Sequence, residues 1–236
     1  MISVCLAVYN GEIFIAEQIN SILIQLGDED EIVVSDDSST DNTIKVLDSF
    51  NDKRIKILRN PRKKNLIFNF ENSLRNAKGD IILTSDHDDI WLPGRVEYYR
   101  NRLKEYDMVV TDSSVINAKG EIIHHSFFDL RNSGKGFMKN LLMNTYIGCC
   151  LGFKKEMLKY YLPFPKDIPM HDIWMGIVSE LTGKVTFDKE VFLLYRRHGN
   201  NISTTSEKTK SSIFRLIIYR WNIIKYFPLI FWRKYF

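Results

Sequence analysis

The sequence has few cysteines and no secretory leader pattern. Its 236 residues include three cysteines, of which Cys149 and Cys150 are adjacent and Cys5 lies in the first apolar run. Three cysteines placed in this way offer no disulfide framework. No basic segment precedes the first apolar run, and Asn10 and Gly11 interrupt that run too early for a signal peptide. These absences favour a protein of the reducing cytoplasm.

The chain also has no hydrophobic run long enough for an ordinary membrane span. Its most apolar segment, 206–236, is interrupted by Arg215, Arg220 and Lys225, and Pro228 breaks a continuous helix. Steps of five residues turn successive basic groups by about 140° around a helix, so one face is not cleanly basic. Because long basic side chains can reach lipid phosphates from several faces, we expect a membrane-associating tail. Packing onto the domain or onto a dimer partner is the alternative.

Strong charge of either sign is absent as well. The net charge is +4, and the basic residues gather in two runs, at 54–64 and 215–234. Neither run is interleaved with a nucleic-acid motif, so we expect no nucleic-acid partner. With 44% hydrophobic residues, the chain can bury one substantial core. One domain with a short appendage is therefore expected.

The sequence does contain a regular alternation of strand-like and helix-like segments. Short apolar runs predict strands, and apolar residues at helical spacing predict the helices between them. The expected strands lie at 3–8, 31–34, 55–58 and 81–83, and the expected helices at 15–26, 40–50 and 69–77. Such alternation predicts the α/β class, with a mostly parallel sheet and helices on both faces.

Two acidic clusters, at 35–38 and 85–89, each follow one of the expected strands. Loops beyond the carboxyl ends of parallel strands are where open α/β sheets bind ligands. Asp86 and Asp88 are one residue apart, so in an extended segment their side chains project to the same side. Paired carboxylates suit Mg²⁺ or Mn²⁺, which leave coordination positions for substrate phosphates. The alternative for either cluster is a solvated turn with a helix-capping Asp.

These motifs together resemble glycosyltransferase family 2. The matching segments, in order, are VCLAVYNGE at 4–12, SDDSSTDNT at 35–43, AKGD at 77–80 leading into SDHDDIW at 85–91, HDIW at 171–174 and YRRHGNN at 195–201. The last two resemble the branch that contains bacterial rhamnosyltransferases and related cell-surface polysaccharide enzymes. The resemblance implies the GT-A fold, a Rossmann-like single domain, over residues 1–205. It implies a nucleotide-sugar-binding half at 1–112 and an acceptor-binding half at 113–205.

The resemblance also implies roles for residues of the donor half. Ala7 and Tyr9 are expected beside the nucleobase, with Tyr9 stacked on it, although this segment is alternatively only a strand-end turn. Asp37 is expected to accept a hydrogen bond from a pyrimidine imide, and Asp36 is a further donor-site candidate. Asp86 is expected to contact the ribose, or the metal through water.

Three further residues are expected around the diphosphate. By resemblance, Asp88 is the direct ligand of a Mn²⁺ or Mg²⁺ ion. His198 is flanked by cations and a glycine, so contact with the diphosphate or the metal is favoured over an ordinary surface position. Arg196 or Arg197 is expected to add charge-assisted hydrogen bonds to phosphate.

The acceptor half supplies the expected general base. Asp172 matches the family position of the residue that takes the proton from the acceptor hydroxyl. His171 and Trp174 are expected to shape the acceptor site, and the alternative for Trp174 is a place in the core. The resemblance implies inversion at the anomeric carbon by direct displacement.

The sequence therefore predicts a metal-dependent glycosyltransferase that acts on a lipid-linked or growing surface polysaccharide. It is expected on the cytoplasmic face of a bacterial membrane, peripherally attached to anionic lipid. The favoured donor is dTDP-rhamnose, followed by UDP-hexose, because uracil and thymine differ by one methyl group, worth about 1–3 kcal/mol in a pocket. A non-catalytic nucleotide-sugar-binding subunit is the alternative function, and a homodimer is an alternative assembly.

Overall fold

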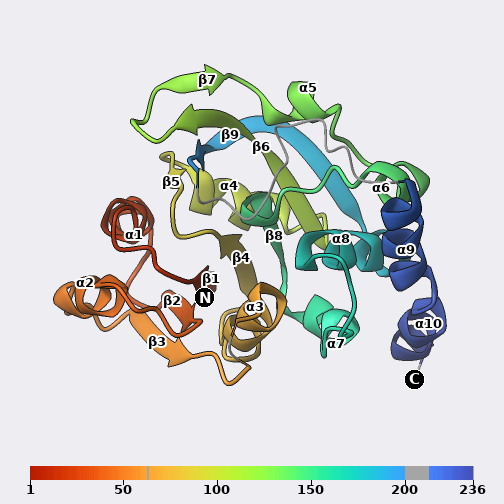
Figure 1. Cartoon of the computed structure of the whole chain (residues 1–236), viewed down its shortest axis with the longest axis horizontal. Helices are drawn as coiled ribbons and strands as arrows, with labels where there is room; N and C mark the ends of the chain where they lie inside the picture. The colour runs from red at the N-terminus through yellow and green to blue at the C-terminus, as the bar shows by residue number, and fades with distance from the viewer. Residues whose placement is uncertain (63, 200–212, 236) are drawn as a thin grey trace.

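A computed structural model describes residues 1–62, 64–199 and 213–235 and shows an α/β architecture around one sheet (Figure 1). The first four long strands are parallel and lie in the order β3-β2-β1-β4, as the alternation of strands and helices predicts. Their bounds are β1 Ile2–Val8, β2 Glu31–Asp36, β3 Ile55–Arg59 and β4 Ile81–Ser85.

The second half of the sheet is mixed. β8 (Leu151–Lys154) runs antiparallel between β4 and β6, and β6 pairs in parallel with β9. The long strands of this half are β6 Met108–Asn117 and β9 Val185–Arg197, and the short ones are β5 Ile90–Trp91 and β7 Ile122–His124. The sheet thus joins the predicted donor and acceptor halves into one continuous structure.

Helices cover both sides of the parallel strands. Figure 1 shows α1 and α2 on one side and α3 on the other, which confirms the expected arrangement. The helices in chain order are α1 Ile15–Leu23, α2 Thr43–Ser49, α3 Leu66–Arg75, α4 Arg95–Arg102, α5 Phe127–Arg131, α6 Phe137–Met143, α7 Leu158–Tyr161, α8 His171–Thr182, α9 Ile213–Ile224 and α10 Phe227–Tyr235.

The register of the parallel strands brings the two acidic clusters together. Leu6 of β1 pairs with Val34 of β2 on one side and with Ser85 of β4 on the other. The loops that follow β1, β2 and β4 therefore leave the sheet at nearly the same level. Since the chain enters both acidic loops from this edge, their carboxylates can reach one common site.

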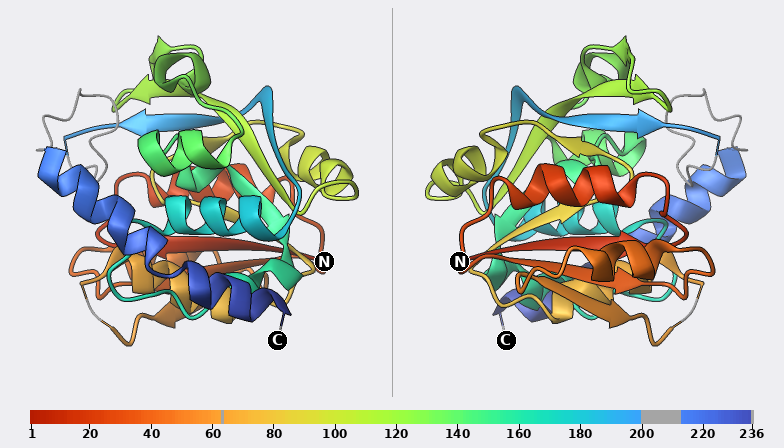
Figure 2. Two further views of the ribbon diagram at one scale, coloured as in Figure 1. Left: turned by 90° about the vertical axis from the view of Figure 1, so that its right-hand side faces the viewer. Right: turned by 90° about the vertical axis from the view of Figure 1, so that its left-hand side faces the viewer.

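The C-terminal segment folds as two helices that lie against the domain beside α8 (Figure 2). The chain breaks between α9 and α10, and Pro228 is the second residue of α10, as its missing N–H and fixed φ predict. Ile223 joins a buried cluster with Leu141, Ile173 and Ile177 from α6 and α8. One face of this segment therefore packs onto the domain. The membrane contact of the segment stays a prediction, and the predicted boundary at residue 205 lies outside the described residues.

The basic side chains of α10 and of the preceding turn also contact the domain. Arg233 donates to the carbonyl oxygens of Tyr160 and Pro163, and Lys234 donates to that of Leu181. Lys225 pairs with Asp167. Within the described part of the chain, no helix is long and apolar enough to cross a membrane.

The buried cluster around Ile223 generates a stability prediction. Ile223→Ala should lower the free energy of unfolding by about 2–5 kcal/mol, because it removes methyl groups from a fully buried position. Ile217→Ala, on the same helix at a side chain that is 60% exposed, is the matched control and should change it by less than about 0.5 kcal/mol. Urea unfolding followed by circular dichroism measures both, and equal effects would contradict docking of α9.

Candidate active site

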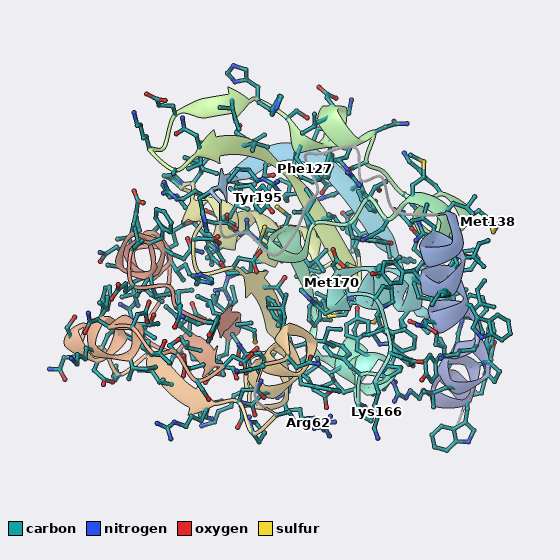
Figure 3. The ribbon with its side chains drawn as sticks, in the orientation of Figure 1. Arg62, Phe127, Met138, Lys166, Met170 and Tyr195 are labelled. Atoms are coloured by element: carbon teal, nitrogen blue, oxygen red, sulfur yellow. The ribbon has the colours of Figure 1, made fainter. Side chains whose placement is uncertain are left out.

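A cavity of about 670 Å³ opens at the carboxyl edge of the parallel strands. Its size lies in the range of small-molecule sites. The sequence-predicted site residues that line it are Ala7, Tyr9, Asp37, Asp86, Asp88, His171, Asp172 and His198. Phe127, Met170 and Tyr195 line its acceptor-half side (Figure 3). Residues from both predicted halves therefore face one space.

The predicted nucleobase end of the cavity is built by the end of β1 and by the loops after β1 and β2. Ala7 and Tyr9 line it, and Tyr9 is exposed, as a ring that stacks on a base requires. The buried carboxylate of Asp37 accepts hydrogen bonds from the backbone N–H groups of Lys64 and Asn65, at 2.8 and 2.9 Å. Asp37 thus also fixes the segment that leads into α3.

Asp36 does not face the cavity, which corrects its assignment as a donor-binding residue. Its carboxylate accepts hydrogen bonds from the backbone N–H groups of Ser38 and Ser39 and from the Ser39 hydroxyl. Ser38 has a φ of +68°, so the turn after β2 needs this local support. Asp36 thus supports a turn, but it is buried and caps no helix, so it also differs from the solvated, helix-capping alternative.

The second acidic cluster concentrates negative charge in the cavity wall. Burial, together with the charges of Asp88 and Asp172, raises the pKa of Asp86 to about 7. Burial would also raise the pKa of Asp88, but a hydrogen bond from His198 and the fields of His87 and His198 hold it below its ordinary value. His198 Nε2 lies 2.8 Å from Asp88 Oδ2. Asp88 and His198 are therefore in contact, and Asp86, the third sequence-predicted metal residue, lines the same cavity.

The residues present fit a divalent cation. Asp89 is fully buried, and its Oδ2 has no hydrogen-bond partner among the described residues. Ligand atoms of Asp86, Asp89 and Cys149 lie within 4.8 Å of one another. Carboxylate oxygens that repel one another in a partly buried wall are the donor set that Mg²⁺ or Mn²⁺ prefers. The sequence interpretation missed Asp89, although it directly follows Asp88, and it gave no signal for Cys149.

Arg196 does not line the cavity, which corrects its predicted phosphate contact. Its guanidinium is buried, donates from Nε to the carbonyl oxygen of Asp88 at 2.8 Å and pairs through Nη2 with Glu17. The guanidinium of Arg196 thus holds the acidic loop from outside the cavity. A cationic residue beside a histidine in the sequence gives no information about which side of the loop it occupies.

The acceptor wall begins at the N-terminus of α8. Asp172 lies in the first helical turn and lines the cavity, and its Oδ1 accepts the backbone N–H of Ile173 at 2.6 Å. Burial raises the pKa of Asp172 to about 6, outweighing the hydrogen bonds that lower it. A carboxylate with this pKa is ionised at neutral pH and is basic enough to accept a proton.

His171 is buried beside Asp172 and stacks on Phe70, with ring centroids 3.9 Å apart. Burial lowers its pKa to about 3, so the ring is neutral, and neither ring nitrogen has a hydrogen-bond partner within the described residues. A Cβ at Gly148 would lie 2.9 Å from Nε2. Glycine at 148 therefore makes room for the ring in the cavity wall.

Trp174 is a core residue, which corrects its assignment to the acceptor site. It is fully buried, and its indole N–H donates to the carbonyl oxygen of Tyr161 at 3.0 Å. Trp174 follows Asp172 by two positions, a rotation of about 200° around the helix axis, so the two side chains leave α8 on nearly opposite sides. Of the four residues in the HDIW motif, only the first two line the cavity.

Known proteins share both the sequence pattern and the fold. The family model "Glycosyl transferase family 2" matches residues 3–162. The Escherichia coli protein WfgD, a UDP-Glc:alpha-D-GlcNAc-diphosphoundecaprenol beta-1,3-glucosyltransferase, is 39% identical over 185 residues, 76% of this chain and 70% of its own. The dTDP-rhamnosyl transferase RfbG of Shigella flexneri is 27% identical over 91% of this chain and 79% of its own.

Solved structures agree on the architecture. S. aureus TarS in complex with UDP superposes with a TM-score of 0.67 at 18% identity, covering 83% of this chain and 60% of the TarS chain. The mannosyltransferase PcManGT from Pyrobaculum calidifontis, in complex with GDP-Man and Mn²⁺, gives 0.64 at 18% identity, covering 85% of this chain and 58% of its own.

The chain is shorter than several of the proteins it resembles. It spans 45% of the length of EpsE of Bacillus subtilis, to which it is 33% identical over 125 residues. The family match nevertheless covers more than half of this chain, including both acidic loops. The chain therefore belongs to glycosyltransferase family 2 and has the GT-A fold.

Proposed function

We propose that this chain is an inverting, metal-dependent glycosyltransferase that transfers a hexosyl group from a UDP-sugar to a lipid-linked saccharide. The observation that carries the proposal is the composition of the cavity. A nucleobase end with Tyr9 and Asp37, an acidic loop with Asp86 and Asp88, and a basic carboxylate at Asp172 line one space. This is the set of groups that a displacement at a sugar diphosphate requires.

In this mechanism, the acceptor hydroxyl lies beside Asp172 and the sugar lies between that carboxylate and the acidic loop. As the hydroxyl oxygen bonds to the anomeric carbon, the bond from that carbon to the diphosphate oxygen breaks, and Asp172 accepts the hydroxyl proton. When bound at Asp88 and Asp86, with His198 beside them, the cation supplies positive charge that stabilises the leaving diphosphate. Attack from the side opposite the leaving group inverts the anomeric carbon.

The neutral ring of His171 is positioned to serve the sugars rather than the phosphates. Neither ring nitrogen has a hydrogen-bond partner among the described residues, and one donates while the other accepts in either tautomer. Sugar hydroxyls can accept a hydrogen bond from one ring nitrogen and donate one to the other. His171 is accordingly assigned to hydroxyl binding next to the base.

We rank UDP-hexose ahead of dTDP-rhamnose as the proposed donor. Identity to WfgD, whose name gives UDP-Glc as donor, is 39%, whereas identity to the dTDP-rhamnosyl transferase RfbG is 27%. The name of WfgD also gives a diphosphoundecaprenol-linked acceptor, which supports a lipid-linked acceptor here. A non-catalytic nucleotide-sugar-binding subunit is the second candidate, and Asp172 in the cavity argues against it because binding alone needs no base.

The same proposal places the protein peripherally on the cytoplasmic face of the membrane. Large apolar side chains on α6, α9 and α10 are exposed: Met138, Leu142, Met143, Ile217, Trp221, Ile224, Phe231, Trp232 and Tyr235. Met138 lies at the outer edge of the molecule beside α9 (Figure 3). Residues 208–236 contain no acidic residue. Exposed Trp and Tyr rings without neighbouring acidic groups in that segment suit the interface of an anionic bilayer.

The donor assignment predicts a ranking of ligands in thermal-shift measurements. With Mn²⁺ present, UDP should raise the melting temperature more than dTDP or GDP, and the shift should grow with ligand concentration. Asp88→Asn should abolish the Mn²⁺-dependent part of the shift, because it removes a carboxylate ligand. A shift of equal size in Asp88→Asn, or a larger shift with dTDP, would overturn the metal or the donor assignment, respectively.

The base assignment predicts a pH profile. With its pKa near 6, Asp172 is protonated below pH 6, so turnover should fall about tenfold per pH unit there and level off above it. Saturating Mn²⁺ in the assay keeps Asp86 ionised. Asp172→Asn should lower turnover by about 10²–10⁴-fold and flatten the acid limb, while UDP affinity measured by calorimetry stays unchanged. Loss of UDP binding with the pH profile intact would make Asp172 a donor ligand.

The membrane assignment predicts vesicle binding that depends on the exposed rings. Trp221→Gln combined with Trp232→Gln should abolish sedimentation with anionic vesicles, since both indoles are about 60% exposed. Ile24→Gln, at a side chain 77% exposed directly after α1, is the matched control and should sediment normally. Unchanged sedimentation of the double variant would contradict a lipid-facing tail, and a change of molecular mass in light scattering would assign the face to a dimer partner.

A further inference from the structure

Arg196 is a buried cation that contacts the acidic loop through its side chain and its backbone. Nε donates to the carbonyl oxygen of Asp88 at 2.8 Å, and the backbone N–H donates to Asp89 Oδ1 at 2.9 Å. Two consecutive residues of the loop are thus tied to one residue of β9. The backbone between Asp88 and Asp89 is thereby fixed relative to the sheet.

The other edge of the guanidinium contacts α1 and the segment before it. Nη2 pairs with Glu17 Oε2 at 2.5 Å, and the guanidinium carbon lies 4.7 Å from the ring centroid of Phe14. Phe14 lines the cavity, and its ring lies 5.0 Å from that of His198. Arg196 therefore links the nucleobase side of the cavity to the acidic loop and lies behind the Asp88–His198 contact.

We propose that Arg196 is a positioning residue that presents the carboxylates of Asp88 and Asp89 to the divalent cation and couples this presentation to α1 through Glu17. The inference rests on the proposed metal-dependent function. Arg196 touches neither the sugar nor the phosphates in this assignment. It acts through the loop that it holds.

The chemistry of the side chain explains why arginine is needed at this position. A guanidinium donates in several fixed directions from one plane and can stack on an aromatic ring at the same time. Here it uses those directions for Asp88 on one edge and Glu17 on another, with Phe14 against its face. A lysine ammonium in the same space is a point charge and cannot maintain all three contacts. Replacing Arg196 with lysine therefore loosens the loop while keeping the positive charge.

The test measures Mn²⁺ binding directly, by electron paramagnetic resonance of the unbound ion during titration in the presence of UDP. Arg196→Lys should weaken Mn²⁺ binding by about 10–100-fold, the usual effect of losing a group that orients metal ligands. Glu17→Gln removes the pairing carboxylate at a partly exposed site and should weaken binding in the same direction by a smaller factor. This second variant keeps the proposal testable if Arg196→Lys does not fold.

Arg102, the last residue of α4, provides a matched control because it pairs with a residue of the same strand, β9. It pairs with Asp188 of β9 at 2.7 Å and lies over the Tyr106 ring at 4.8 Å, and it does not line the cavity. Arg102→Lys should therefore lower the melting temperature without changing Mn²⁺ binding. Mn²⁺ binding that is equally weak in Arg102→Lys would mean a general structural effect and would overturn the positioning role.

The outcomes for Arg196 and for the proposed function are distinguishable. Native Mn²⁺ affinity in Arg196→Lys and Glu17→Gln, together with its loss in Asp88→Asn, would overturn the positioning role and leave the metal site in place. Native affinity in Asp88→Asn as well would overturn the proposed metal site itself. The inference is supported if Arg196→Lys binds Mn²⁺ weakly and still binds UDP fully at raised protein concentration and saturating Mn²⁺.

Discussion

The structure depends on one electrostatic constraint, which is the presence of several carboxylates in the wall of one partly buried cavity. Burial and the neighbouring charges of Asp88 and Asp172 raise the pKa of Asp86 to about 7. The protein offsets part of this repulsion with His198, which contacts Asp88, and it places the cation of Arg196 behind the loop. The remaining negative charge faces the cavity, where the proposed function assigns it to the binding of a divalent ion.

The strand pairing of the sheet brings these carboxylates to one cavity. Pairing of β1 with both β2 and β4 sets the acidic loops at one level, and α8 brings Asp172 into the wall of the same cavity. The C-terminal helices support that wall, because Ile223 packs against Ile173 and Ile177 of α8. Docking of α9 and the position of Asp172 on α8 therefore depend on the same buried contacts.

Much of this could be predicted from local sequence pattern. The alternation of apolar runs predicts the parallel strands, and the spacing of Asp86 and Asp88 predicts a shared direction, because both depend on neighbouring residues only. Two of the three errors, at Trp174 and Arg196, concern side chains whose partners are distant in sequence. Asp36 and Asp37 are adjacent, yet one caps a turn and the other holds the segment before α3. Trp174 and Arg196 bind carbonyl oxygens of residues 161 and 88, which no local pattern reveals.

The central claim, that the acidic loop binds a divalent ion together with a nucleoside diphosphate, is tested most directly by phosphorus electron–nuclear double resonance of Mn²⁺ bound with UDP. The account predicts phosphorus hyperfine coupling typical of phosphate oxygens coordinated directly to the ion, and its disappearance in Asp88→Asn. Mn²⁺ bound to the native protein without phosphorus coupling would contradict it.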